Sequence, residues 1–117
     1  MTPEQFFDGS PAGLALYRAL AAAVGALGPA EVRVGKAQIS FRRRKGFAYV
    51  WRPGQYVTSS VPAVLSFGLP IRLHSPRIKQ VVQPAPNVWM HHVELWEPAQ
   101  VDAEVHSWLE AAYANAG

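Results

Sequence analysis

Four consecutive basic residues near the middle of the chain carry its clearest chemical signal. They are Arg42, Arg43, Arg44 and Lys45. Guanidinium groups bind phosphate and carboxylate oxygens in bidentate fashion, so a cluster of this kind can hold an anionic ligand. We predict an anion-binding site here, with Lys36 and Arg52 assisting. The alternative is a solvated hairpin tip, because charged residues also keep sheet edges from associating.

Alternating aromatic residues follow the basic cluster. Phe47, Tyr49 and Trp51 occupy every second position, and side chains two residues apart in a β-strand share one face of the sheet. The intervening Ala48 and Val50 are equally suited to burial, so the pattern leaves open which set faces the core. Aromatic rings that face the core are structural, whereas rings that face solvent form a stacking platform beside the basic cluster.

The segment from Lys45 to Trp51 also resembles the ribonucleoprotein octamer of RNA-recognition-motif domains. A basic residue for phosphate and alternating aromatics for bases would suit RNA binding. The neighbouring sequence does not fit that fold, because no aromatic strand precedes the first helix. In addition, Pro62 and Pro70 oppose a helix after the octamer. We therefore expect a β-strand of an unrelated sheet.

The histidines show no pattern typical of a catalytic or metal site. His91 and His92 are neighbours on a predicted strand, so their side chains point to opposite faces and do not readily share one ion. We predict that His91 is partly buried and that His92 is exposed. The chain has no cysteine and no HExxH spacing, so we expect no catalytic residue, no metal site and no cofactor. The residues predicted to stack on a ligand or line a pocket are Phe47, Tyr49, Trp51 and His92.

The net charge of +3 conceals a segregation of charge along the chain. Between Val32 and Val93 there are ten Lys or Arg residues and no Asp or Glu. All eight acidic residues lie outside that span, where Arg18 alone opposes them, so the middle carries +10 and the flanks −7. This segregation indicates an anionic partner for the middle segment. It fits equally well an attraction between a basic sheet and acidic helices.

Helix signals bracket the basic middle segment. Ser10-Pro11 is a typical helix start and Gly28-Pro29 a typical stop, and Asp102 is the expected N-cap of a second helix. Residues 32–41 read as one long strand, kinked at Gly35, and its end forms a hairpin with residues 47–51. Further strands are expected at residues 61–69, 77–83 and 88–96.

These elements predict the fold class. Because no helix separates the strands, the sheet should be antiparallel. We predict an α+β fold of two layers, in which an antiparallel sheet of four to six strands carries the N- and C-terminal helices on one face. Residues 1–9 are expected to be a loosely held tail, and residues 10–117 a single domain.

The composition excludes several classes of protein. Half of the residues are hydrophobic, which is enough for a core and argues against disorder. No apolar run approaches the roughly 20 residues of a membrane-spanning helix, and the acidic N-terminal segment lacks the features of a signal peptide. We therefore expect a cytoplasmic protein with no membrane partner.

Three separated strings resemble one bacterial family. They are VRVGKAQISFRRRKGFAYVWRP, WMHHVEL and VDAEVHSWLEAAYANAG, in that order. The chain is similar, from about Tyr17 to Gly117, to the bacterial domain-of-unknown-function family 5655. This resemblance implies a compact α+β domain, found alone or at the end of longer proteins. It implies no activity, cofactor or catalytic residue.

Three functional hypotheses follow from the sequence. The first is a non-enzymatic binding module whose basic hairpin contacts an anionic partner, with nucleic acid as the leading candidate through its phosphates. The second is a protein-interaction or self-association module, such as a homodimer, in which the charge is incidental. The third is a small-molecule pocket or enzyme with His91 or His92 as proton carrier, which ranks last because no nucleophile or carboxylate is evident beside them.

Overall fold

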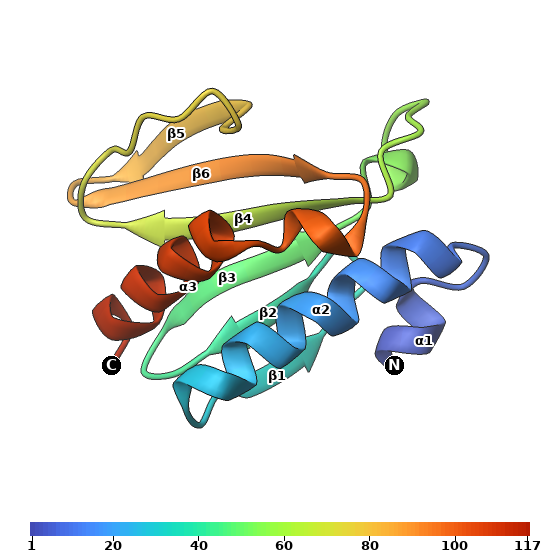
Figure 1. The fold of residues 1–117 in the computed structure, drawn as a ribbon, viewed down its shortest axis with the longest axis horizontal. Coiled ribbons are helices and arrows are strands. Elements are labelled where there is room, and N and C mark those ends of the chain that lie inside the picture. The colour runs from blue at the N-terminus through green and yellow to red at the C-terminus, as the bar shows by residue number, and fades with distance from the viewer.

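A computed structural model describes all 117 residues and shows two layers, with the helices on one face of a single sheet (Figure 1). The six strands are antiparallel and lie in the order β1-β2-β3-β4-β6-β5. This confirms the predicted α+β class, and six strands is the upper limit of the four to six that the sequence predicts. The elements are α1 (Pro3–Phe6), α2 (Pro11–Leu27), β1 (Glu31–Val34), β2 (Ile39–Arg42), β3 (Gly46–Trp51), β4 (Ala63–Leu69), β5 (Gln80–Ala85), β6 (Val88–Leu95) and α3 (Ala103–Asn115). None of the helices has the length and apolar character needed to cross a membrane.

The two long helices begin where the sequence predicts. The Ser10 hydroxyl accepts a hydrogen bond of 3.2 Å from the backbone N–H of Gly13, which caps α2. Asp102 caps α3 in the same way, through the backbone N–H of Val105 at 3.2 Å. Gly28 ends α2 with a φ of 147°, a conformation that favours glycine.

The N-terminal segment differs from the loosely held tail that the sequence predicts. Thr2 and Gln5 form a reciprocal capping box around α1. Phe6 and Phe7 are only 3% and 2% exposed and belong to the core. The Arg52 guanidinium donates hydrogen bonds of 3.2 Å to the carbonyl oxygens of Phe6 and of the neighbouring Asp8. Tertiary contacts therefore hold this short segment, which has no periodicity to reveal it.

The prediction of one long strand over residues 32–41 is wrong. The chain reverses at Gly35, whose backbone N–H donates to the Gln38 carbonyl at 2.9 Å. β1 and β2 then pair antiparallel, with Val34 opposite Ile39. The sheet has an additional strand at its edge as a result, and Lys36 lies in the turn.

An irregularity in the second hairpin decides which aromatic side chains are buried. The β2–β3 hairpin forms as predicted, with Ile39 opposite Val50, but its register shifts between Phe41 and Arg42. Such a β-bulge places one extra residue on one strand and changes the alternation of side chains. Phe47 is thereby buried, and its ring meets Tyr113 of α3 edge-on at 5.6 Å.

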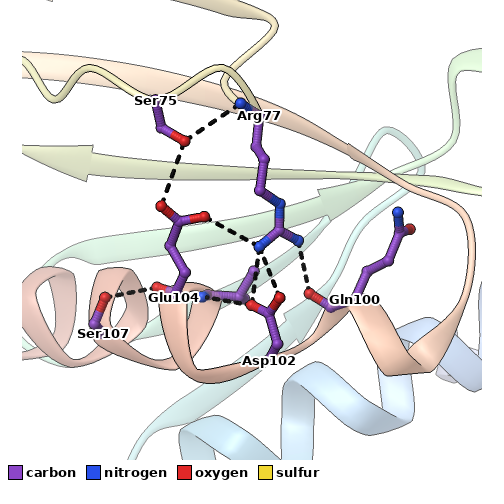
Figure 2. A network of polar contacts seen from close by, with 7 residues as sticks. Ser75, Arg77, Gln100, Asp102, Glu104 and Ser107 are labelled. Atoms are coloured by element: carbon purple, nitrogen blue, oxygen red, sulfur yellow. Dashed lines mark hydrogen bonds and ion pairs between the residues drawn. The ribbon is translucent and has the colours of Figure 1, made fainter.

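A polar network fastens the loop between β4 and β5 to the start of α3 (Figure 2). One nitrogen of the Arg77 guanidinium lies 2.9 Å from Asp102 Oδ1 and 3.2 Å from Glu104 Oε1. Its other terminal nitrogen donates to the Gln100 carbonyl at 2.9 Å. The hydrogen bond from Arg77 is the main reason why the pKa of Asp102 lies below its usual value. Arg77, one of the ten cations of the basic middle segment, therefore has a structural role.

Candidate functional site

The sheet face turned away from α2 and α3 presents a continuous line of polar side chains. Directly paired residues share a face of the sheet. Their strand neighbours point towards the helices, where Phe41 stacks on Tyr17 of α2 and Phe67 stacks on Trp108 of α3. We call the opposite side the open face. The line crosses all six strands through Arg33, Ser40, Tyr49, Ser66, His92 and Gln80.

Tyr49 and Trp51 are the aromatic residues of β3 on the open face, and both are half-buried. The Tyr49 hydroxyl lies over Gly46, where it would collide with a Cβ atom, and a terminal nitrogen of Arg42 lies 2.9 Å from the same point. The tyrosine ring and the Arg42 guanidinium are therefore neighbours. The predicted aromatic set is split, since Phe47 belongs to the core and the other two do not.

A hydrogen-bonded chain of three side chains fixes Trp51 in place. The indole Nε1–H donates to Ser66 Oγ at 2.9 Å, and Ser66 Oγ lies 2.6 Å from His92 Nδ1. Because an indole can only donate, Ser66 Oγ accepts from Trp51, and it shares a second hydrogen bond with His92 Nδ1. Burial lowers the pKa of His92, which favours the neutral imidazole.

The Ser66–His92 pair lacks the surroundings of a nucleophilic site. Ser66 is 3% exposed and lies in the middle of β4, between β3 and β6. The backbone N–H groups of a central strand are used in the sheet ladder, so none is free to stabilise an oxyanion. The pair instead orients the indole and the imidazole.

His91 lies on the helix side, opposite His92 as predicted. It is fully buried rather than partly buried, and His92 is half-buried rather than exposed. The His91 ring stacks on Phe67 at 4.8 Å, and its Nε2 accepts the backbone N–H of Leu73 at 2.9 Å. Nδ1 lies 3.3 Å from the Phe67 carbonyl, to which it donates. Burial is the main cause of its lowered pKa. Both ring nitrogens are occupied, which argues against a role for His91 as proton carrier.

A cavity of about 340 Å³ opens on the open face next to Trp51. Such a volume lies near the lower end for small-molecule sites. Glu94, a half-buried residue of β6, contributes the only carboxylate of the lining. Five of the seven lining residues, Glu94 among them, fall outside the predicted site. The lining consists of Trp51, Pro53, Val64, Lys79, Gln80, His92 and Glu94.

Sequence reasoning missed Glu94 because it assigned the acidic residues to the helical flanks of the chain. Glu94 lies two residues from His92, so both share a face of β6. Its position across from Val64, with Trp51 on the other side of that valine, depends on the pairing of β3, β4 and β6. The two-residue spacing was the available signal, and the strand register supplies the rest.

The six cations predicted to form one site lie at two ends of the sheet. Four of them, Arg42 to Lys45, stand at the β2–β3 turn, whereas Lys36 and Arg52 lie at the opposite ends of the same strands. A strand of this length spans about 20 Å, so the two groups are separate. The structure therefore does not bring together the six residues that the sequence groups.

Arg43 and Arg52 make contacts within the fold. The Arg43 guanidinium stacks over the Tyr113 ring at 4.0 Å and donates to the Tyr113 carbonyl at 2.8 Å, at the end of α3. Arg52 holds the carbonyl groups after α1, as described above. Both side chains are therefore partly committed to structure.

Only two of the ten basic residues of the middle segment pair with carboxylates. They are Arg33, which lies 2.6 Å from Glu31, and Arg77. The eight others form no ion pair within 4.0 Å, so a broad attraction between a basic sheet and acidic helices accounts for little of the charge. Nor does any group of three or more His, Cys, Asp or Glu side chains lie close enough together to hold a metal ion.

The fold and this face define a small two-layer α+β domain with half-buried aromatic and polar side chains on the side away from its helices. The chain belongs to the family described as Domain of unknown function (DUF5655), whose model matches residues 3–116. This confirms the resemblance drawn from the three sequence strings. Comparisons with curated proteins and with solved structures gave no match. The family description names no activity.

Proposed function

We propose that this protein binds single-stranded nucleic acid along the open face of its sheet. The observation that carries the proposal is the outward orientation of Tyr49 and Trp51 between two groups of cations without carboxylate partners. Proteins that bind single strands combine aromatic platforms for bases with cations that follow the backbone. Both components are present on neighbouring side chains here, since Arg42 lies beside Tyr49.

The strand would run roughly parallel to β3. Phosphates contact Arg42, Arg44 and Lys45 at one end, and Lys36 and Lys79 at the other. Each stacked base contributes about 1–3 kcal/mol, and each phosphate contact adds binding that weakens with salt. The length of about 20 Å fits a short binding site, near the lower limit of about 4 nucleotides seen for single-strand sites on OB-folds.

A single strand suits this surface better than a duplex. The bases of a duplex are stacked on one another and offer no free ring face to Tyr49 or Trp51. The Trp51 indole is held by Ser66 at 2.9 Å and meets the His92 ring edge-on at 6.2 Å, so it is orientated before a ligand arrives. Preorganised aromatic side chains lose little conformational entropy on binding.

The strand edges of the sheet give little support to the alternative of pairing with another protein strand. β1 has only four residues and carries the Glu31–Arg33 ion pair. β5, at the other edge, contains Pro84, which has no N–H to donate. Short, charged or proline-containing edges disfavour the addition of a further strand.

The test is fluorescence anisotropy with labelled single- and double-stranded DNA and RNA at low and near-physiological salt. We expect single strands to bind more tightly than duplexes, with non-specific dissociation constants on the order of 10–100 µM at physiological salt. The double variant Arg42→Glu/Arg44→Glu should lose most of this binding. The control Arg18→Glu/Arg72→Glu makes the same charge change away from the open face and should bind as well as the unaltered protein. Absence of binding at low salt would overturn the proposal.

A further inference from the structure

We infer that the cavity beside Trp51 is a base-selective subsite that prefers guanine. The inference rests on the proposed function, because it names the base that one position of the bound strand would hold. It goes further in that the phosphate and stacking contacts above are indifferent to sequence, whereas this subsite discriminates by hydrogen bonding.

The cavity spans three neighbouring strands, and we refer to it below as the slot. Trp51 on β3, Val64 on β4 and Glu94 on β6 are directly paired neighbours. Two strand spacings separate the outer residues, so their backbones lie about 10 Å apart. Val64, a short apolar side chain that is 4% exposed, forms the floor between them. A flat aromatic ring can therefore enter above this floor, with the indole at one side and the carboxylate at the other.

The Glu94 carboxylate supplies two acceptor oxygens on one side of the slot. It forms no ion pair and no side-chain hydrogen bond, although Lys79 lines the same cavity. A half-buried carboxylate without a partner lacks compensation for its reduced hydration. Two neighbouring N–H donors on a ligand would satisfy both of its oxygens.

Donors line the remainder of the slot. His92 Nδ1 lies 2.6 Å from Ser66 Oγ. For this subsite we assign the tautomer in which Nδ1 accepts from this hydroxyl, so that Nε2–H is presented to the slot. Lys79 and Gln80 reach the cavity from the start of β5 and are both exposed. The lining therefore has an acceptor pair on Glu94 and donors on His92, Lys79 and Gln80.

Guanine matches this arrangement of donors and acceptors. Its N1–H and exocyclic N2–H₂ are adjacent donors for a carboxylate, and its O6 and N7 are acceptors for the opposing donors. Cytosine and adenine each bring one exocyclic amino group, so they satisfy the carboxylate in part. Uracil and thymine flank their single N–H with two carbonyl groups, which a carboxylate repels. The expected order is guanine first, cytosine and adenine next, and uracil or thymine last.

The experiment measures base preference separately from strand binding. The probes are labelled T-only octamers and matched octamers with one central G, A or C, titrated by anisotropy at fixed low salt. A bidentate contact to a base predicts about a five- to hundredfold tighter dissociation constant for the G-containing octamer than for the T-only octamer. Glu94→Gln, which replaces one acceptor oxygen by a donor, should abolish this preference and leave binding of the T-only octamer equal or slightly tighter.

The matched control is Glu110→Gln, which removes the same charge from the exposed surface of α3 and should keep the guanine preference. The Glu94 side chain forms no hydrogen bond within the fold, so its replacement breaks none. Circular dichroism melting of both variants checks that they fold. Equal binding of all octamers, a preference for another base, or a preference that survives in Glu94→Gln overturns the inference but not the proposed function. Failure of every octamer to bind overturns both.

Discussion

His91 and His92 are consecutive residues with opposite surroundings. His91 is fully enclosed between the sheet and the loop that follows β4, where it accepts the Leu73 N–H. His92 faces the cavity, and its Nδ1 lies 2.6 Å from Ser66 Oγ. Burial is the principal cause of a lowered pKa for both, so each is neutral in the folded protein at neutral pH.

The lowered pKa values of the two histidines lead to a prediction about the pH dependence of stability. A histidine whose pKa is lowered by folding binds more protons when unfolded, so the free energy of unfolding falls as pH drops below about 6.5. We expect less stability at pH 5 than at pH 8 in urea denaturation.

The variant His91→Gln should lower the free energy of unfolding by about 1–3 kcal/mol at pH 8, because the Leu73 N–H is then without its acceptor. It should also reduce the difference in stability between the two pH values. The exposed His106→Gln serves as control, and an unchanged pH dependence in His91→Gln would contradict this account.

The Ser66 hydroxyl shows how one small residue can organise a surface. It accepts from Trp51 and lies against His92, and these two side chains border the cavity. Serine on a strand carries no particular functional signal in a sequence. Its importance comes from its position on β4 between β3 and β6, which bring Trp51 and His92 to its hydroxyl.

Among the elements, α1 is the helix that the sequence pattern failed to reveal. Its four residues bring an aromatic pair to the core, where Phe7 meets Phe6 edge-on at 4.9 Å and lies 6.3 Å from Tyr17. The Phe7 ring also lies under Arg52, 6.0 Å from the guanidinium carbon. The helix therefore closes one end of the core instead of trailing from it.

A truncation of the Phe7 side chain tests the role of α1. Phe7→Ala should lower the free energy of unfolding by about 3–5 kcal/mol, as expected for removal of a buried phenylalanine. The control Val57→Ala alters an apolar residue that is 62% exposed and should change stability by less than about 0.5 kcal/mol. Chemical denaturation of the two variants provides the comparison. Equal midpoints would mean that the N-terminal segment does not stabilise the fold.

On the scale of the whole molecule, the cations proposed to contact phosphates fall into two groups separated by the length of the sheet. The β2–β3 turn holds one group, and the turn at Lys36 together with Lys79 holds the other. The open face with its aromatic side chains lies between them. The cations therefore mark the ends of a surface, and a ligand that uses both groups must cross that surface.

The separation predicts how binding depends on strand length and salt. An octamer should bind more weakly, and to a similar degree, in Arg42→Glu/Arg44→Glu and in Lys36→Glu/Lys79→Glu, since each variant removes the cations at one end. For single strands, the slope of log K against log salt should fall by about 0.7 for each phosphate that the variant no longer neutralises. A dinucleotide is too short to reach both groups of cations. Its binding should therefore be much less affected by one of the two double variants than by the other. Full octamer binding by Lys36→Glu/Lys79→Glu would restrict the site to the β2–β3 end.

Several features of the fold follow from local patterns. Ser10 and Asp102 are good N-caps whatever surrounds them, and Gly28 ends a helix because it tolerates a positive φ. The absence of helices between the strands indicates an antiparallel sheet. Local patterns give the wrong prediction at Gly35, because a kinked strand and a tight turn have similar sequence signals. The pairing of β1 with β2 decides between them.

The sequence by itself determined the fold class, the caps of the long helices, the hairpin and the segregation of charge, because these depend on residues close together in the chain. Tertiary structure alone decided that Phe47 is buried while Tyr49 and Trp51 face away from the helices. One extra residue in a strand reverses the alternation of its side chains. The meeting of Trp51, Ser66, His92 and Glu94 likewise depends on the register of three strands, which is set by the packing of the whole core and not by the spacing of residues along any one of them.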